Sequence, residues 1–222
     1  MGNDVMLSIN MKKALFILSA FVPVVVFISG MGAVLMWYSL FVLLYFLRER
    51  IAPVVKRIPL PTFPLLFLMI WVLGMATEAT FWSDMFVIGV GDTGLDQGRS
   101  PNLWTHLYLY LGLYGSIALA WTLMLWWFRF TLPQVFITQG VAGFTVEQQF
   151  AIVIAALANP LTVIWFPYLA AIYSPFVAIP FMLLQERIGA RQRLDHWIKY
   201  PLALFLQIFI LSLLTILASF WS

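Results

Sequence analysis

Long apolar runs dominate this sequence and constrain its fold more than any other feature. Because 63% of the 222 residues are hydrophobic and only 9% are charged, against roughly half and a quarter in a soluble domain, too little polar surface exists to face water. The sequence therefore predicts an all-α, polytopic membrane protein. Five runs are bounded by charged residues or by proline and glycine: 14–47, 64–76 with an uneven continuation toward 89, 103–128, 150–184 and 201–221.

Two of these runs are too long to cross a bilayer once. Runs 14–47 and 150–184 would each extend about 50 Å as a straight helix, whereas the hydrocarbon core is about 30 Å thick. Each run holds helix breakers near its middle, which predicts a hairpin of two short or tilted spans and about seven transmembrane helices in all. The breakers are Ser29, Gly30 and Gly32 in the first run and Pro160, Pro167 and Pro175 in the other.

The placement of basic residues supports this threading, since cytoplasmic loops of membrane proteins collect Lys and Arg. With both long runs folded as hairpins, eleven of the twelve basic residues fall on one side and only Arg99 falls on the other. We therefore predict a multi-pass protein of the cell inner membrane with a cytoplasmic N-terminus and an external C-terminus. A cleaved signal peptide is the alternative for the first run, because Lys12 and Lys13 precede it, although no clean Ala-x-Ala site follows.

A shift of 137 residues aligns the first and last thirds of the chain. Identical residues then coincide at several positions: Leu47, Glu49, Arg50 and Ile51 fall on Leu184, Glu186, Arg187 and Ile188, and Pro23 falls on Pro160. Such a match indicates a parallel three-plus-one-plus-three internal repeat, an arrangement found in some small transporters. The alternative is that two hairpins flanked by basic loops look alike because membrane topology makes them so.

The expected organisation is a single membrane domain over residues 1–222. Its parts are a first three-span unit (12–88), an outer loop (89–102), a central span (103–128), a connecting segment (129–149) and a second three-span unit (150–221).

Few polar residues fall at membrane depth, where a carboxylate costs about 3 kcal/mol on insertion scales. Glu78 lies toward the outer end of the third predicted span, and His106 lies one turn into the fourth. If these spans are antiparallel neighbours, the two side chains occupy similar depths and could relay protons or act as acid, base or ligands. The alternative for His106 is an interfacial anchor beside Trp104 and Tyr108.

Three further residues are candidates for a ligand or transport path. Asn159 and Pro160 interrupt an apolar run, and broken helices at the membrane midplane are where small transporters bind their cargo. Helix kinking alone explains the same pair. Glu147 precedes the fifth span on the predicted cytoplasmic side, where an acid could line a vestibule or simply complement the helix dipole.

Small residues every four positions along the central span form a packing face, made by Gly112, Ser116 and Ala120. Such faces let helices approach closely, either within the chain or with another membrane protein. Beyond the lipid bilayer, these possible protein contacts are the partners that we expect. The sequence shows no basic patch of nucleic-acid-binding character.

Several chemistries are excluded or unsupported. The absence of cysteine excludes a disulfide framework and a thiolate nucleophile, and Asp92 and Asp96 lack the further ligands of a calcium loop. No metal site is predicted, and no cofactor is specified.

Three functions remain open. We favour a non-catalytic component of a membrane complex, such as a subunit, assembly factor or scaffold, because this function needs no polar site. The second is a small-molecule permease built on the repeat. The third is an intramembrane enzyme that acts on a lipophilic substrate through Glu78 and His106.

Overall fold

In the computed structural model, regular secondary structure is entirely helical over the part of the chain that the structure describes, apart from one isolated bridge between Phe128 and Leu194. This confirms the all-α prediction. The structure describes residues 16–19, 21, 24, 32, 35–87, 100–147, 159, 166–189 and 194–219. The helices are α2 (Met36–Lys56), α3 (Thr62–Phe86), α4 (Leu103–Trp127), α5 (Leu132–Glu147), α7 (Phe166–Tyr173), α8 (Pro175–Gly189) and α9 (Lys199–Ser219).

Three of the described helices are long and apolar enough to cross a membrane. These are α3, α4 and the Lys199–Leu217 part of α9. Each has at least 19 residues, close to the roughly 20 that a bilayer core requires. The finding supports a membrane location.

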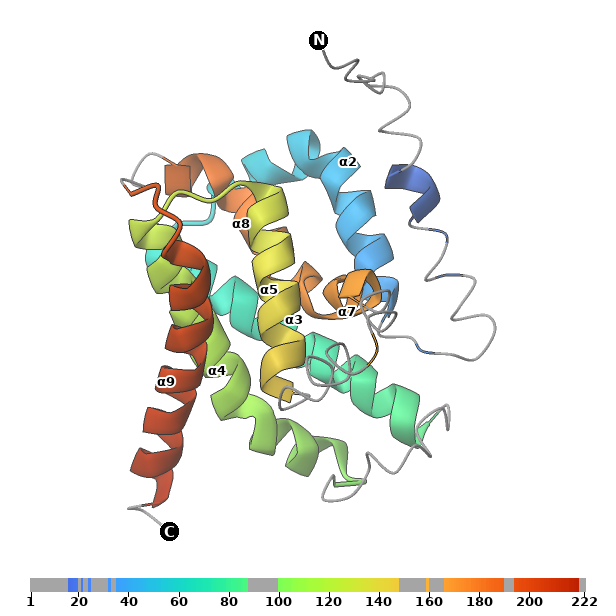
Figure 1. Cartoon of the computed structure of the whole chain (residues 1–222). Helices are drawn as coiled ribbons and strands as arrows, with labels where there is room; N and C mark the ends of the chain where they lie inside the picture. Colours follow the sequence, from blue (N-terminus) through green and yellow to red (C-terminus); the bar gives the residue numbers. More distant parts are fainter. Residues whose placement is uncertain are drawn as a thin grey trace.

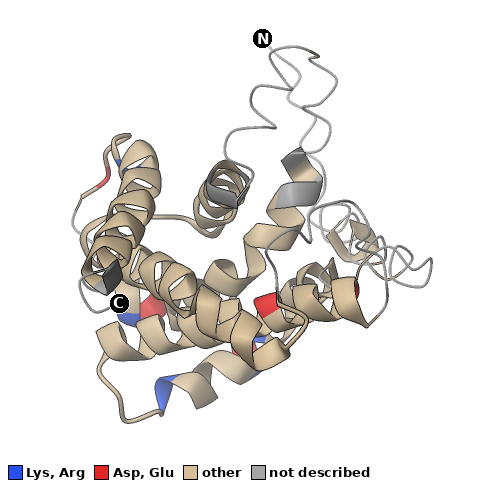
Figure 2. Ribbon diagram, turned by 90° about the horizontal axis from the view of Figure 1, so that it is seen from below, with Lys and Arg blue, Asp and Glu red and all other residues tan. Residues whose placement is uncertain are grey.

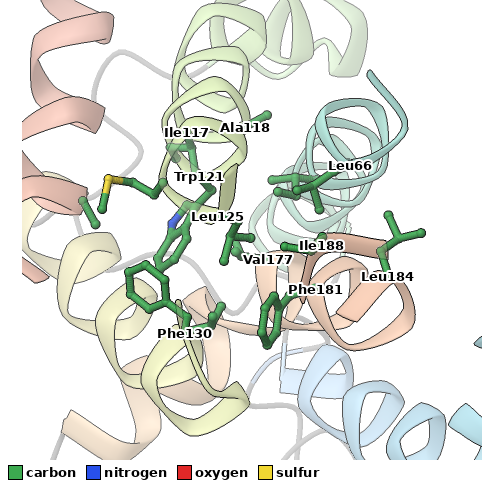
Figure 3. Packing of buried hydrophobic residues seen from close by; sticks show 14 of the residues in the cluster. Leu66, Ile117, Ala118, Trp121, Leu125, Phe130, Val177, Phe181, Leu184 and Ile188 are labelled. Atoms are coloured by element: carbon green, nitrogen blue, oxygen red, sulfur yellow. The ribbon is translucent and has the colours of Figure 1, made fainter. Parts of the chain in front are cut away.

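Helix α4 lies between α3 and α9, and α8 fills the space among α2, α3 and α5 (Figure 1). Every residue of α8 from position 175 to 184 is buried, as expected for a helix that is apolar on all sides. Figure 3 shows the resulting core, in which Trp121 and Leu125 of α4 lie near Val177 and Phe181 of α8. The interior is therefore a packed apolar core built around α4 and α8.

Helices α3 and α4 are antiparallel neighbours. At one end, the Phe63 ring meets the Trp126 ring edge-on with centroids 5.6 Å apart. At the other end, Trp82 donates from Nε1 to the Ser100 carbonyl oxygen over 3.2 Å. Midway, Gly74 allows the Tyr114 ring to lie directly against the α3 backbone. This arrangement places the last third of α3 beside the first third of α4.

Buried Lys199 holds three segments together at the start of α9. Its Nζ donates to the Arg129 carbonyl oxygen (2.6 Å), to Asp195 Oδ1 (2.7 Å) and to Gln134 Oε1 (3.2 Å). A buried ammonium requires such partners, because burial of an unpaired charge is very unfavourable. The contact places Arg129 and Lys199 at one end of the bundle, as the charge distribution predicts.

The same end of the bundle gathers other charged residues. Lys56 pairs with Glu186, and Arg187 donates to the Leu60 carbonyl oxygen. These contacts join the end of α2 and the start of α3 to the end of α8. Figure 2 shows that charged residues are few along the described helices. We call the end marked by Lys56, Arg129, Arg187 and Lys199 the basic end.

The structure describes only part of each of the two long apolar runs. Helix α2 continues to Lys56, beyond the predicted boundary at Leu47, because Arg and Glu are good helix formers. The described helical break in the second run falls at Ser174, which precedes Pro175, in agreement with one of the three predicted breakers. The breakers Ser29, Gly30 and Pro160 lie outside the described residues.

The segment predicted as a connection, 129–149, contains a packed helix. Helix α5 contacts α7, α8 and α9, and Val135, Gln139 and Ala142 are buried on it. Its apolar residues are interrupted by Gln134, Thr138 and Gln139, so the sequence of this segment lacks the continuous apolar run of a membrane span. Two of these polar side chains accept hydrogen bonds from other helices: Gln134 from Lys199 Nζ and Gln139 from Trp121 Nε1.

The positions of the helices agree in part with the predicted internal repeat. A shift of 137 carries the first residue of α3, Thr62, onto the first residue of α9, Lys199, and most of α2 onto α8. The packing is less symmetric: α3 packs against α8, whereas no comparable contact joins α9 to α2 among the described residues. The internal repeat therefore stays a prediction.

Candidate functional site

Glu78 and His106 form a buried hydrogen-bonded pair between α3 and α4. The His106 Nε2 atom lies 2.6 Å from Glu78 Oε1, and the side chains are 0% and 3% exposed, respectively. The sequence predicts that the two lie at similar depth, and the antiparallel packing brings them into direct contact. Their distance from the basic end is about 24 Å along α3, since Glu78 follows Thr62 by 16 residues at about 1.5 Å each.

Tyr114 completes this group, which we call the buried triad. Its hydroxyl donates to the second carboxylate oxygen, Glu78 Oε2, over 2.9 Å. The contact depends on Gly74, one turn before Glu78, because a side chain there would overlap the Tyr114 ring. Sequence reasoning missed Tyr114, although its spacing of eight residues from His106 is a signal for the same face of a helix.

The local sequence of α4 directs His106 inward. Asn102 caps the helix by accepting hydrogen bonds from the backbone N–H groups of Trp104 and Thr105. Trp104 and Tyr108 are 77% and 72% exposed, whereas His106 is fully buried and its ring packs on Tyr110 at 4.7 Å. The anchor interpretation therefore does not fit His106, and the exposed aromatic residues at this end of α4 are Trp104 and Tyr108.

The contact with Glu78 uses one of the two ring nitrogens of His106, Nε2. An ionised carboxylate only accepts hydrogen bonds, so beside an ionised Glu78 the Nε2 atom is the donor. The other ring nitrogen, Nδ1, is buried without a hydrogen-bond partner. In a neutral imidazole it is an unprotonated lone pair, and in an imidazolium it would be an uncompensated donor. The Nδ1 atom of His106 is therefore the polar atom of this group that the fold leaves without a partner.

A small cavity lies next to the triad, on the other side of Tyr114. Its volume is about 10 Å³, close to the space that one water molecule needs. Gln139 Nε2 and Gln207 Oε1, a donor and an acceptor, are buried without partners in its wall, and Gln139 Oε1 accepts from Trp121 Nε1. A bridging water there would satisfy both unpartnered atoms, so the polar groups extend from α3 to α5 and α9.

The other predicted path residues do not join the triad. Asn159 is exposed. Pro160 lies outside the described residues, as does the side chain of Glu147, whose backbone forms the last residue of α5. A path through Asn159, Pro160 and Glu147 therefore stays a prediction. The polar residues found inside the fold instead are Gln139 and Gln207, which sequence reasoning overlooked as isolated amides in apolar stretches.

The small-residue face of α4 packs mainly inside the chain. Ser116 and Ala120 are fully buried by neighbouring helices of this chain, so these two residues serve packing within the chain, one of the two predicted uses of this face. Gly112 is exposed and a Cβ there would meet nothing within 4 Å. A partner contact through this face would therefore use Gly112.

Among the described residues, no three His, Cys, Asp or Glu side chains lie close enough to hold a metal ion together. Comparisons with protein-family models, curated proteins and solved structures find no match to this chain.

Proposed function

We propose that this protein is a non-catalytic component of a membrane complex, acting as a subunit, assembly factor or scaffold. The observation that supports it is the closed environment of the buried triad. Glu78, His106 and Tyr114 bond to one another, and the cavity described beside them has room for about one water molecule. Such an arrangement joins α3 to α4, and the cavity beside it is too small for a substrate.

Helix α9 is the membrane helix best placed to contact a partner. Only 17% of its apolar 18-residue window is buried inside the chain, against 50% for α4. Phe205 and Phe209 stack on its surface, with ring centroids 5.8 Å apart and exposures of 60% and 52%. Aromatic residues are enriched in the centres of protein interfaces, so this pair is our candidate contact.

Purification from native membranes in mild detergent tests the proposal. We expect a membrane protein to copurify at fixed stoichiometry, and the double substitution F205A/F209A to release it. The matched control is L68A/V72A, which removes an exposed apolar pair of the same spacing on α3. A chain that purifies alone, or a partner that both double variants retain, would contradict the proposal.

A proton-coupled small-molecule permease is the second candidate. The polar groups that run from His106 through Tyr114 to Gln139 and Gln207 support it, because intramembrane ionisable residues mark proton or ion paths by default. The complete proposal includes seven spans, a cytoplasmic N-terminus and the three-span repeat. In proteoliposomes with an internal pH dye, E78Q would abolish proton uptake that the unmodified protein shows, and uptake by neither protein would remove this candidate.

The intramembrane-enzyme alternative is weaker. The Glu78–His106 separation is within the reach that acid–base chemistry needs. A lipophilic substrate would also need a cavity that opens on the pair, and the cavity described beside Tyr114 holds only about one water molecule.

A further inference from the structure

An open cavity separates α2 from α5, away from the buried triad. Its volume is about 620 Å³, within the range of about 300–1,000 Å³ that holds a drug-sized ligand. The residues around it come from α2, α5 and α8, with one contribution from further upstream. They are Phe16, Tyr38, Phe41, Tyr45, Arg48, Leu132, Pro133, Phe136, Ile137 and Gln185.

The lining of this cavity is polar at one end and aromatic at the other. Arg48 and Gln185 lie toward the basic end, because Gln185 precedes the Glu186 that pairs with Lys56. Tyr38 lies ten residues before Arg48 on α2, which places it about 15 Å further from that end. At this deeper level the Tyr38 and Phe41 rings lie 6.1 and 5.1 Å from the Phe136 ring. An elongated ligand with one polar end matches this gradient.

Arg48 gives the polar end a positive charge. Its guanidinium lies 4.5 Å from the centre of the Tyr45 ring, and it forms no ion pair with the residues that the structure describes. Two nearby cations differ in this respect, since Lys56 pairs with Glu186 and Lys199 pairs with Asp195. Guanidinium groups bind phosphate oxygens through two parallel hydrogen bonds. The polar end of the cavity can therefore bind an anion, next to the aromatic end.

We propose that this cavity binds an anionic phospholipid of the surrounding membrane. The phosphate lies at Arg48 with Gln185 nearby, and one acyl chain lies along Tyr38, Phe41 and Phe136. The basic end supports this choice, because Lys and Arg collect where a protein meets the headgroups of the cytoplasmic leaflet. The acyl chain covers the apolar surface of the cavity, and the phosphate balances the positive charge of Arg48.

Substitutions at two arginines, Arg48 and Arg50, distinguish lipid binding at this site from general attraction of lipid to a basic surface. Arg50 lies on the same helix two residues later, is exposed, and does not line the cavity. Ile137 is 62% exposed at the cavity wall, so I137W can fill the cavity without replacing a buried side chain. R48K retains the charge and serves as the conservative variant.

Native mass spectrometry of the full chain in mild detergent provides the test. Phosphatidylglycerol or phosphatidylcholine with identical acyl chains is added, and bound lipid is counted. We expect the unmodified protein and R50Q to retain one phosphatidylglycerol at a concentration at least tenfold below that needed for phosphatidylcholine. R48Q should lose this preference, R48K should keep most of it, and I137W should weaken retention of both lipids.

Three results would overturn the proposal. They are equal loss of preference in R48Q and R50Q, unchanged retention in I137W, and a copurifying free fatty acid that phosphatidylglycerol does not displace. Melting temperatures of all variants are measured in the same detergent, and R48Q is compared at a temperature where it is fully folded. Loss of binding in a folded R48Q therefore reports the site itself.

Discussion

Tyr114 packs its ring directly against Gly74, and this contact between α4 and α3 brings the Tyr114 hydroxyl to the carboxylate of Glu78. The approach is possible only because position 74 has no side chain. Close helix approach at small residues is a general packing device in membranes. Here it also determines which polar groups meet inside the bundle.

The substitution G74A is expected to destabilise the fold by about 1–3 kcal/mol, since a Cβ would overlap the Tyr114 ring in a packed interior. G112A is the control, because a Cβ at position 112 meets nothing within 4 Å. Unfolding in mixed micelles measures both free energies. Equal stability of G74A and G112A would show that Tyr114 can move away without loss.

The Glu78–His106 pair is expected to show strong energetic coupling. Residues in one buried hydrogen-bond network commonly have interaction energies of about 0.5–3 kcal/mol in double-mutant cycles. The cycle uses E78Q, H106Q and the double variant, with unfolding free energy as the readout. Y114F, which removes one hydrogen bond to Glu78, should cost about 0.5–1.5 kcal/mol. Additive effects of E78Q and H106Q would mean that the pair does not act as a unit.

The features that could be predicted best from the sequence are those that depend on the position of a residue along an apolar run and on its charge. The antiparallel pairing that places Glu78 beside His106, and the grouping of Arg129 with Lys199, both follow from apolar runs bounded by charged residues. These patterns are strong because lipid excludes charge over the whole length of a span.

Features that depend on side-chain partners could not be read from the pattern. Residues 129–149 were predicted as a connecting segment between two apolar runs, whereas the structure shows helix α5 there, in which Gln134 accepts from Lys199 and Gln139 accepts from Trp121. Each partner is 18 or more residues away in the sequence. The sequence does not reveal these hydrogen-bond partners, so an amide in an apolar segment looks like the end of a helix.

The stability of the α9 start should depend on acid pH through Asp195. The hydrogen bond from Lys199 and its positive charge hold the pKa of Asp195 below its usual 3.8. A carboxyl with a depressed folded-state pKa contributes stability above the unfolded pKa, and that contribution is lost as pH falls through the folded value. NMR titration should therefore place the pKa of Asp195 under 3.8 and move it upward in K199M. No change in K199M would contradict the assignment of the ion pair.

The orientation of α3 offers a direct test of the proposed topology, because the chain contains no cysteine and each introduced thiol is the only one present. Arg57 lies just before α3, and Asn102 lies just before α4, which returns antiparallel. With a cytoplasmic basic end, a membrane-impermeant maleimide applied to intact cells should label N102C and leave R57C unlabelled until the membrane is opened. Labelling of R57C in intact cells would reverse the orientation of α3, and with it the leaflet that supplies the phospholipid at Arg48. Labelling of both positions from outside would mean that α3 does not cross the membrane.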